Sequence, residues 1–405
     1  MRVLISHETY EWFGGTETYM LTIAQQLEWL GHEAVIHAQR IGPMADFARG
    51  EGVSVTDTAT QLPRSIDLLL AQDTASAVEL SARFPDAVCI FVAHSRGFAG
   101  QFPPQIADIC QAVVVLNDRV RRFIEQLPFC PPIVRLRQPI DLARFGTIGL
   151  YPERPRRAAV IGNYLRGAQA TLLAQACHEV GMDVAWVGAH GHATPRPEHA
   201  IADADVVIGL GRCVLEAMAG RRAAYVYGVA GGDGWVTPAS YAAFEADGFS
   251  GQVTGAPLDL EALASTLREW NVAMGHDNRA LAKAHHGAQT HAMELIELVR
   301  DLGAGEREPL TRALELARLV RAEWQAQARF AGVADDNRAL RERLDELERH
   351  AARVTEHSRL AEEANARALA EITRELEELR ATRRYRLASR IAAPLDHVRA
   401  RWSPR

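Results

Sequence analysis

Short apolar runs alternate with amphipathic segments along roughly the first 300 residues of the chain. The runs 2–6 (RVLIS), 66–72 (IDLLLAQ) and 112–117 (AVVVLN) have the length and composition of buried strands. Between the first two, apolar residues recur at helical spacing from Met20 to Leu30, and the glycine that follows is a common helix end. Strands that alternate with helices predict a parallel sheet covered by helices on both faces.

The same alternation begins again after a proline-containing segment, 135–146 (RLRQPIDLARFG). Strand-like runs follow at 158–163 (AAVIGN) and 205–209 (DVVIG), with a helical segment between them. Two successive units of similar size predict an α/β fold with two Rossmann-like domains that face a cleft. The expected boundaries are 1–143 for the N-terminal domain, 144–303 for the C-terminal domain, 304–380 for a coiled coil and 381–405 for a basic amphipathic tail.

The coiled coil is predicted from a long segment rich in Arg, Glu, Ala and Leu, 308–392, which has no proline between Pro309 and Pro394. Apolar or small residues fall in alternating steps at 340, 344, 347, 351, 354 and 361. Asn365 takes the next core position, and Leu369, Ile372, Leu376 and Leu379 continue in a register displaced by four residues. We therefore expect a homo-oligomer formed through this segment. The alternative is a single solvated helix stabilised by ion pairs between residues i and i+4.

The tail carries eight Arg from Arg380 onward, against the single acid Asp396. Apolar side chains fall on one helical face, at 387, 391, 395, 398 and 402. A basic amphipathic segment of this kind favours attachment to an anionic membrane surface. The alternative is a solvated tail that packs on the coiled coil.

Composition narrows the class of protein. The net charge is -6, and it divides into +3 over residues 304–405 and -9 over the rest, which argues against duplex nucleic acid as the main ligand. Lys283 is the only lysine, so a phosphate clamp would have to be built from arginine. The five cysteines are widely spaced without a CxxC pair, so neither a disulfide framework nor a zinc site is indicated. The chain shows no signal-peptide pattern and no long apolar span, so we expect a cytoplasmic protein.

The most informative stretch for chemistry is 203–238. It predicts a buried strand at 205–209, a helix from about Cys213, a second strand at 224–227 and then a glycine loop. The loop residues are Gly231, Gly232, Asp233 and Gly234. In a parallel sheet, ligands bind at the carboxyl ends of the strands, and glycines allow backbone amides to approach an anion closely. With Glu216 near the start of the helix, this arrangement predicts a pocket for a nucleotide sugar.

Three segments resemble a known family, the family-4 retaining glycosyltransferases. LEAMAGRRAAYVYGVAGG is similar to the donor-binding segment of that family, FGGTETYMLTIAQQLEWLGHEAVIHA to its N-terminal segment, and QPIDLARF to its interdomain connection. The resemblance covers roughly residues 1–303 and implies the two-domain GT-B fold. It also implies transfer of a sugar from a nucleotide-diphosphate sugar, with retention of configuration, no cofactor and no metal. The N-terminal domain would bind the acceptor and the C-terminal domain the donor.

The resemblance assigns roles to individual residues. Glu216 matches the carboxylate that holds the ribose hydroxyls, whereas Ile208 stands where the family has a carboxylate that contacts the donor sugar. Asn163 and Arg166 match an Arg and a Lys that reach the diphosphate, and Arg212 would supply the charge that Asn163 lacks. His94 matches a histidine that approaches the donor sugar. Backbone amides of the residues Gly14, Gly15, Gly231, Gly232, Asp233 and Gly234 would bind the diphosphate from either side.

Plainer interpretations stay open for each of these residues. His94 would be a hydrogen-bonded histidine at a strand end, and Glu216 a carboxylate that stabilises a helix N-terminus. Arg212 would be a surface residue, and the 231–234 glycines a turn. Two candidate metal motifs are set aside. Asp203-Ala204-Asp205 precedes a buried strand, and the pair His190 and His192 has no third ligand nearby.

Two functions of different classes follow from the sequence. The first is a cytoplasmic, metal-independent glycosyltransferase that acts on a glycan or lipid-linked acceptor in cell-envelope or polysaccharide synthesis, peripheral to the inner face of the plasma membrane. The second is a catalytically lapsed GT-B scaffold that assembles or tethers other molecules through its coiled coil. Ile208 and Asn163 favour the second interpretation, while Glu216 and His94 favour the first.

Overall fold

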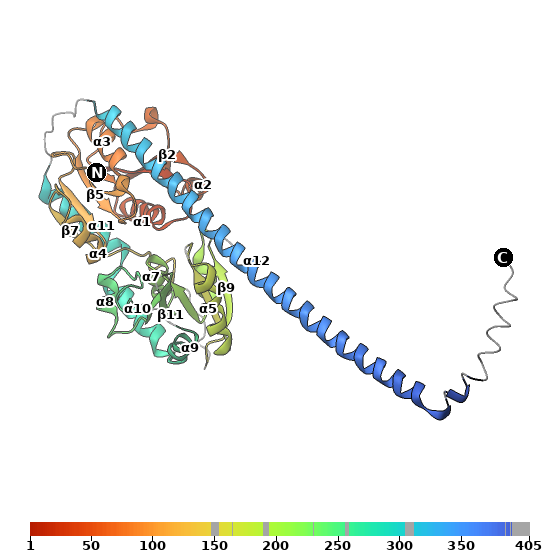
Figure 1. The fold of residues 1–405 in the computed structure, drawn as a ribbon. Coiled ribbons are helices and arrows are strands. Elements are labelled where there is room, and N and C mark those ends of the chain that lie inside the picture. The colour runs from red at the N-terminus through yellow and green to blue at the C-terminus, as the bar shows by residue number, and fades with distance from the viewer. Residues whose placement is uncertain are drawn as a thin grey trace. The chain divides into compact units, whose positions relative to one another are not determined.

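The computed structural model describes residues 1–146, 154–163, 165–188, 194–229, 231–255, 259–303, 312–384, 386–388 and 390. The chain divides into two compact units, Met1–Arg329 and Phe330–Arg405. The first unit contains both sheets, and the second continues the helix with which the first one ends (Figure 1).

The first sheet has seven strands in the order β3-β2-β1-β4-β5-β6-β7, and every neighbouring pair is parallel, which confirms the predicted parallel sheet. The strands are β1 (Arg2–Tyr10), β2 (Glu33–Ile41), β3 (Ser54–Thr56), β4 (Leu68–Ala71), β5 (Val88–Ala93), β6 (Ala112–Val115) and β7 (Ile133–Arg135). The helices between them are α1 (Gly15–Trp29), α2 (Pro43–Gly50), α3 (Thr74–Arg83) and α4 (Asp118–Ile124), with short 3-10 turns at Ala59–Gln61 and Ala99–Gln101.

Polar caps fix where two of these helices begin. Asp73 follows β4 and accepts a hydrogen bond from the backbone amide of Ser76 at 2.9 Å. Asn117 follows β6 and accepts one from the amide of Val120 at 2.8 Å. Each cap satisfies an amide that the first helical turn leaves free. The strand-to-helix turns at this edge of the sheet are therefore set by the local sequence.

The second sheet has five strands in the order β12-β11-β10-β8-β9. They are β8 (Arg157–Ile161), β9 (Asp183–Val187), β10 (Val206–Gly209), β11 (Ala223–Gly228) and β12 (Gly231–Trp235). The accompanying helices are α5 (Gly167–Glu179), α6 (Pro197–Asp203), α7 (Arg212–Ala219), α8 (Tyr241–Ala246), α9 (Leu260–Arg268) and α10 (Ala273–His285). All strand pairs are parallel except β12, which runs antiparallel to β11.

The glycine loop expected at Gly231, Gly232, Asp233 and Gly234 is the edge strand β12, so the prediction of a turn there was wrong. One of the glycines, Gly232, permits close packing. A Cβ atom at Gly232 would lie 2.7 Å from the carbonyl oxygen of Val226 and 2.8 Å from the ring of Tyr227. The register shifts between Val226 and Tyr227, as at a β-bulge, where glycine is common.

Helix α11 (Ala288–Leu302) ends beside Gly303, where the sequence placed the end of the second domain. Its apolar face, however, is buried in the core of the first domain, where Leu295 and Ile296 join the cluster that includes Ile23 and Leu27 of α1. The helix thus crosses back from the second domain to the first (Figure 1). From the sequence we assigned this helix to the second domain, because nothing local indicates which sheet it covers.

Helix α12 (Ala313–Ala381) also begins against the first domain. Its Arg321 donates a hydrogen bond to Glu8 at 2.8 Å and forms an ion pair with Glu79. The Trp324 ring meets the ring of His7 edge to face, with centroids 5.5 Å apart. From the sequence we expected the coiled coil to begin at residue 304. The segment Ala313–Arg329 is instead packed on the first domain. Residues 391–405, which hold most of the predicted tail, lie outside the described residues.

Candidate functional site

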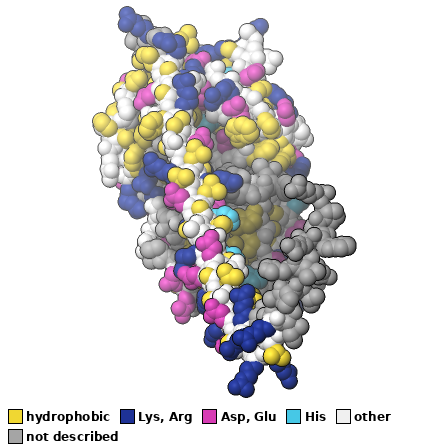
Figure 2. All heavy atoms as spheres, turned by 45° about the vertical axis from the view of Figure 1, so that its right-hand side comes forward, with side chains coloured by type: hydrophobic (Ala, Val, Ile, Leu, Met, Phe, Trp, Pro, Cys, Tyr) yellow, Lys and Arg dark blue, Asp and Glu magenta, His cyan; other side chains and the backbone are white. Residues whose placement is uncertain are grey.

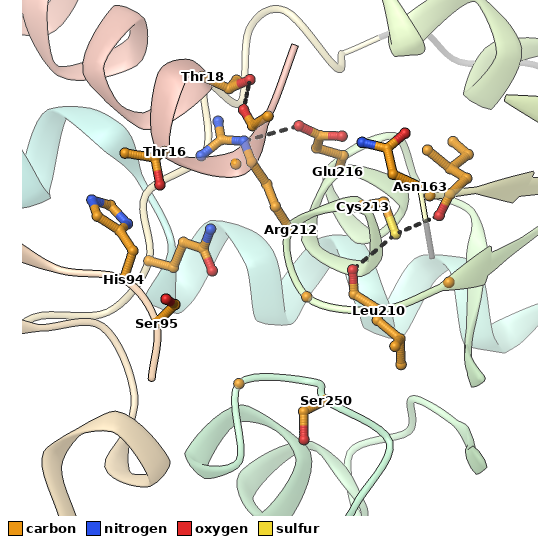
Figure 3. Close-up of a pocket in the computed structure, with 18 of the residues that line it drawn as sticks. Thr16, Thr18, His94, Ser95, Asn163, Leu210, Arg212, Cys213, Glu216 and Ser250 are labelled. Carbon is orange, nitrogen blue, oxygen red and sulfur yellow. Dashed lines mark hydrogen bonds and ion pairs between the residues drawn. The ribbon is translucent and has the colours of Figure 1, made fainter. Parts of the chain in front are cut away.

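A cavity of about 910 Å³ lies where the carboxyl ends of the strands of both sheets meet. From the first domain it is lined by residues that follow β1, β5 and β6, and from the second by residues that follow β8, β9 and β10. This is the edge at which parallel α/β sheets bind ligands. Figure 3 shows Thr16, His94 and Ser95 on one side, Asn163 and Glu216 on the other, and Arg212 extending between them.

Two helices begin at this cavity. Gly14 and Gly15 line it at the start of α1, and Gly211 and Arg212 line it at the start of α7. The turn from β10 into α7 is tight, since a Cβ atom at Gly209 would lie 2.5 Å from both the carbonyl oxygen of Ile161 and the sulfur of Cys213. The first amides of a helix are free to donate to a ligand, and the helix dipole favours an anion there.

Arg212 and Glu216 form a buried ion pair on α7. Arg212 Nε donates to Glu216 Oε1 at 3.0 Å, and the two residues are 9 % and 5 % exposed. The other guanidinium nitrogens of Arg212 donate to the carbonyl of Pro139 and to the hydroxyl of Thr22, each at 3.1 Å. Arg212 therefore connects the second domain, the interdomain segment and helix α1, and it is not a surface residue.

Burial disfavours the charged forms of this pair. It raises the pKa of Glu216, and the neighbouring positive charge of Arg212 opposes that shift. Burial likewise lowers the pKa of Arg212, and the charge of Glu216 opposes it. Each charge thus depends on the other for its stability in the site, although a guanidinium stays protonated in any case.

His94 follows β5 and lines the cavity. Its Nε2–H donates to Oε1 of Gln72, and its ring meets that of Tyr19 edge to face at 4.9 Å. Burial is the largest of the effects that lower the pKa of His94 to about 3, and the positive charges of His7 and Arg212 add to it. The imidazole is therefore neutral near pH 7, with a tautomer fixed by Gln72.

The structure brings together only some of the sequence-predicted residues. Gly14, Gly15, His94, Asn163, Arg212 and Glu216 line the cavity. Among the described residues that line it, Arg166 and the 231–234 strand do not appear. Arg166 lies at the N-cap of α5, and Asp233 Oδ1 accepts a hydrogen bond from the amide of Thr254 at 2.8 Å.

Two other positions singled out in the sequence, the missing sugar-contacting carboxylate and the candidate metal motif, are occupied by structural contacts. Ile208, where the family has a carboxylate, is fully buried within β10. Asp205 of the Asp-Ala-Asp motif accepts hydrogen bonds from the backbone amides of Arg156 and Arg157 at 2.8 and 3.0 Å. Within the part of the chain that the structure describes, no group of three or more His, Cys, Asp or Glu side chains is placed to hold a metal ion. His190 and His192 lie outside that part.

Sequence reasoning missed two arginines of the first domain, Arg96 and Arg119, which line the cavity. Arg119 donates to Oε1 of Gln252 at 3.0 Å and lies 3.8 Å from Asp247, both in the second domain. Burial lowers the pKa of Arg119, and the charge of Arg96 lowers it further. The signal was present, because Arg96 comes three residues and Arg119 four residues after a strand end, in AHSR and VLNDR.

No family model matches this sequence, and a search of the curated proteins finds no match either. Solved structures are similar in fold. An alpha-glucosyltransferase in complex with UDP and a 13-mer DNA containing a HMU base is 11 % identical, with a TM-score of 0.51 over 74 % of this chain and 99 % of that one. The chain has the GT-B fold.

Two further GT-B structures fall slightly below that score. Anabaena Alr3699/HepE in complex with UDP and glucose is 12 % identical, with a TM-score of 0.49, and covers 74 % of this chain and 99 % of that one. WaaG, a glycosyltransferase involved in lipopolysaccharide biosynthesis, is 13 % identical, with a TM-score of 0.48 and coverage of 73 % and 99 %. None of the helices among the described residues has the length and apolar character needed to cross a membrane.

Proposed function

We propose that the protein is a glycosyltransferase that moves a sugar from a nucleotide-diphosphate sugar to an acceptor. The observation that carries this proposal is the cavity itself. The N-termini of α1 and α7 and the guanidinium groups of Arg96 and Arg119 converge on it from strand ends of both sheets. Two neighbouring guanidinium groups are stabilised when an anion binds between them, because it compensates their mutual repulsion.

The chemistry of the reaction requires such an arrangement. When the bond between the anomeric carbon and the diphosphate breaks, new negative charge develops on the leaving oxygens. Donors aimed at those oxygens lower the barrier, and the loss of one donor slows such reactions by about 10²–10³-fold. Arg96 and Arg119 would act from the first domain, and the amide of Arg212, at the start of α7, from the second. The amide of Gly211 already donates to the carbonyl of Phe249 at 2.9 Å. This charge would be matched without a metal ion or a cofactor.

Glu216 would bind the nucleotide ribose. Its Oε1 holds Arg212, and Oε2 would accept a ribose hydroxyl without breaking that ion pair. His94, neutral near pH 7, would hydrogen-bond the donor sugar near the reacting carbon, with the acceptor approaching from the first domain. The resemblance to the family-4 enzymes supports retention of configuration. The contacts with the diphosphate first expected of Asn163 and Gly15 are retained in this proposal, because these residues line the cavity. Gly14 lines it too, but its amide donates to the carbonyl of Trp12 at 3.1 Å, so the amide contact expected of Gly14 is dropped.

We place the enzyme in the cytoplasm, acting on a glycan or lipid-linked acceptor in cell-envelope or polysaccharide synthesis. The basic composition of the tail from Arg380 supports attachment to an anionic membrane surface. Sedimentation with anionic vesicles, compared between the full chain and a chain that ends at Ala381, tests this attachment. Equal sedimentation of the two would contradict it.

A catalytically lapsed GT-B scaffold is the second candidate. The observation that favours it is the replacement of the family's sugar-contacting carboxylate by the buried Ile208. A scaffold of this kind would show no donor turnover with any acceptor, even where a nucleotide binds.

Binding of UDP-, GDP-, ADP- and dTDP-sugars, measured by thermal shift and calorimetry, tests the proposal. One nucleotide should raise the melting temperature, and Arg96→Gln should weaken its binding by about tenfold or more, as expected for a hydrogen bond to a charged group. Arg64→Gln removes an exposed arginine that does not line the cavity, and it should bind like the wild type. The proposal fails if no nucleotide binds, or if the two variants bind alike.

A further inference from the structure

The second unit, from Phe330, exposes a row of large apolar side chains. Leu340 is 66 % exposed, Leu347 57 % and Ile372 59 %. The row consists of Phe330, Val333, Leu340, Leu344, Leu347, Val354, Leu369, Ile372, Leu376 and Leu379. Figure 2 shows hydrophobic and charged side chains interspersed along the helix. An apolar row of this length on a helix indicates that something covers it.

The spacing of the row fixes a seven-residue repeat. Steps of three and four residues alternate, which defines the core positions a and d of a coiled coil. The a positions are 330, 337, 344, 351, 358 and 365, and the d positions are 333, 340, 347, 354 and 361. After Asn365 the pattern gains four residues and continues with a at 369 and 376 and d at 372 and 379. An insertion of four residues unwinds the supercoil locally and leaves the core continuous.

We propose that Phe330–Ala381 forms a parallel, in-register, two-stranded coiled coil with a second copy of this chain. Two polar core residues determine the orientation. Asn337 and Asn365 both occupy a positions, where in a parallel pair each meets its own copy and the two amides hydrogen-bond. An antiparallel pair centred on the core residues, from Phe330 to Leu379, would place Asn337 beside Ile372 and Asn365 beside Leu344. Each amide would then be buried without a partner, which is unfavourable.

Charges beside the core agree with the same orientation. In a parallel pair, position g of one helix faces the next e position of the other. Three such pairs carry opposite charges: Asp336–Arg341, Arg343–Glu348 and Glu375–Arg380. The ion pairs within the helix itself include Arg338–Asp335, Arg359–Glu356 and Arg374–Glu378, all at the outer positions b, c and f.

Small residues at the core determine the number of helices. Ala351, Ser358 and Ala361 occupy three of the four core positions between 351 and 361, and Val354 occupies the fourth. They allow two helix backbones to approach closely, whereas in a larger bundle they would leave the centre unfilled. A second copy of the chain is thus the partner that fits this face in size, polarity and charge. The inference concerns assembly and is independent of the reaction proposed above.

Charge exchange in the full chain tests the register. Arg343→Glu alone and Glu348→Arg alone each place like charges at two symmetric g–e contacts, and each should weaken the dimer roughly tenfold in sedimentation equilibrium. Mixing the two variants restores both contacts and should yield a heterodimer. Arg349→Glu makes the same charge change at the outer f position and should leave the dimer unchanged. A monomer at all concentrations, a trimer, or a mixture without preference for the heterodimer would overturn the proposal.

Disulfide crosslinking tests the orientation. In a background that carries Cys130→Ser, to remove the partly exposed native thiol, Leu344→Cys and Asn365→Cys should each crosslink to a second copy of itself on oxidation. Glu356→Cys, at the outer f position, should not. If instead the first two crosslink only when mixed with each other, the helices are antiparallel and the proposal is wrong.

Discussion

The buried pair Arg212–Glu216 provides a sharp test of the electrostatics of the site. In the variant Arg212→Met, the side chain keeps much of its length but loses its charge. Glu216 is then left 5 % exposed without the guanidinium that hydrogen-bonds it, and the charge of Arg144 is the largest remaining influence that favours its ionised form. Removing one partner of a buried ion pair destabilises proteins by about 3–5 kcal/mol.

The size of this effect should depend on pH. Burial already raises the pKa of Glu216, and Arg212 is the largest influence that opposes the rise. Without Arg212, the folded state would take up a proton at pH values where the unfolded chain stays ionised. The destabilisation of Arg212→Met should therefore shrink as the pH falls, by up to ~1.4 kcal/mol per pH unit, until the pH approaches the unfolded-state pKa near 4.5.

Urea unfolding of the wild type and the variant at pH 8.0, 7.0, 6.0 and 5.5 would measure the difference. The double variant Arg212→Met/Glu216→Leu is the control, because it removes both charges. It should be more stable than Arg212→Met at pH 8, and its difference from the wild type should vary less with pH. A loss of stability in Arg212→Met that is the same at every pH would refute the reasoning.

Three further predictions concern stability. Burial lowers the pKa of His291 to about 4. The unfolded chain therefore binds a proton from about pH 6.5 downward while the folded chain does not, so the free energy of unfolding decreases as the pH falls. His291→Gln should reduce the loss between pH 6.5 and 5 by about 2 kcal/mol in thermal unfolding, and an unchanged loss would contradict the assignment. Trp324→Ala should lower the free energy of unfolding by about 3 kcal/mol in urea, whereas the same change at the exposed Trp29 should alter it by less than about 0.5 kcal/mol. Equal effects of the two substitutions would show that Trp324 is not packed in the core. Gly232→Ala should destabilise the protein by about 1–3 kcal/mol, because the added Cβ would lie 2.7 Å from the carbonyl oxygen of Val226. Gly50→Ala should be neutral or stabilising, because no atom lies within 4 Å of the added carbon. A neutral Gly232→Ala would contradict the packing of β12.

The parts of the fold that local sequence determines were predictable. The run at 205–209 is the strand β10, and the helix expected from about Cys213 is α7, which begins at Arg212. The end of α11 is equally local, because Gly303, a glycine at a positive φ, terminates this helix. Apolar runs and helix ends depend on neighbours in the sequence, and so they can be read from it.

Features that depend on distant contacts were not predictable in this way. GGDGW has no alternation of apolar and polar residues, so nothing local distinguishes the strand β12 from a turn. The pairing of Arg212 with Pro139 and Thr22 requires both domains to be in place. For the same reason, Arg96 and Arg119 could be recognised as neighbours only when the strand ends had been brought together.

The first turns of α12 have a consequence for how the protein can be shortened. Gln327 Oε1 accepts a hydrogen bond from the amide of Ala99 at 3.3 Å, and the Trp324 ring covers Gly100. The loop they touch continues from His94–Gly97, which forms one wall of the cavity. A fragment that stopped at Gly303 would leave this loop uncovered and Glu8 without its arginine. The smallest autonomous piece that preserves the cavity should therefore extend to Arg329, well beyond the last residue of the two sheets.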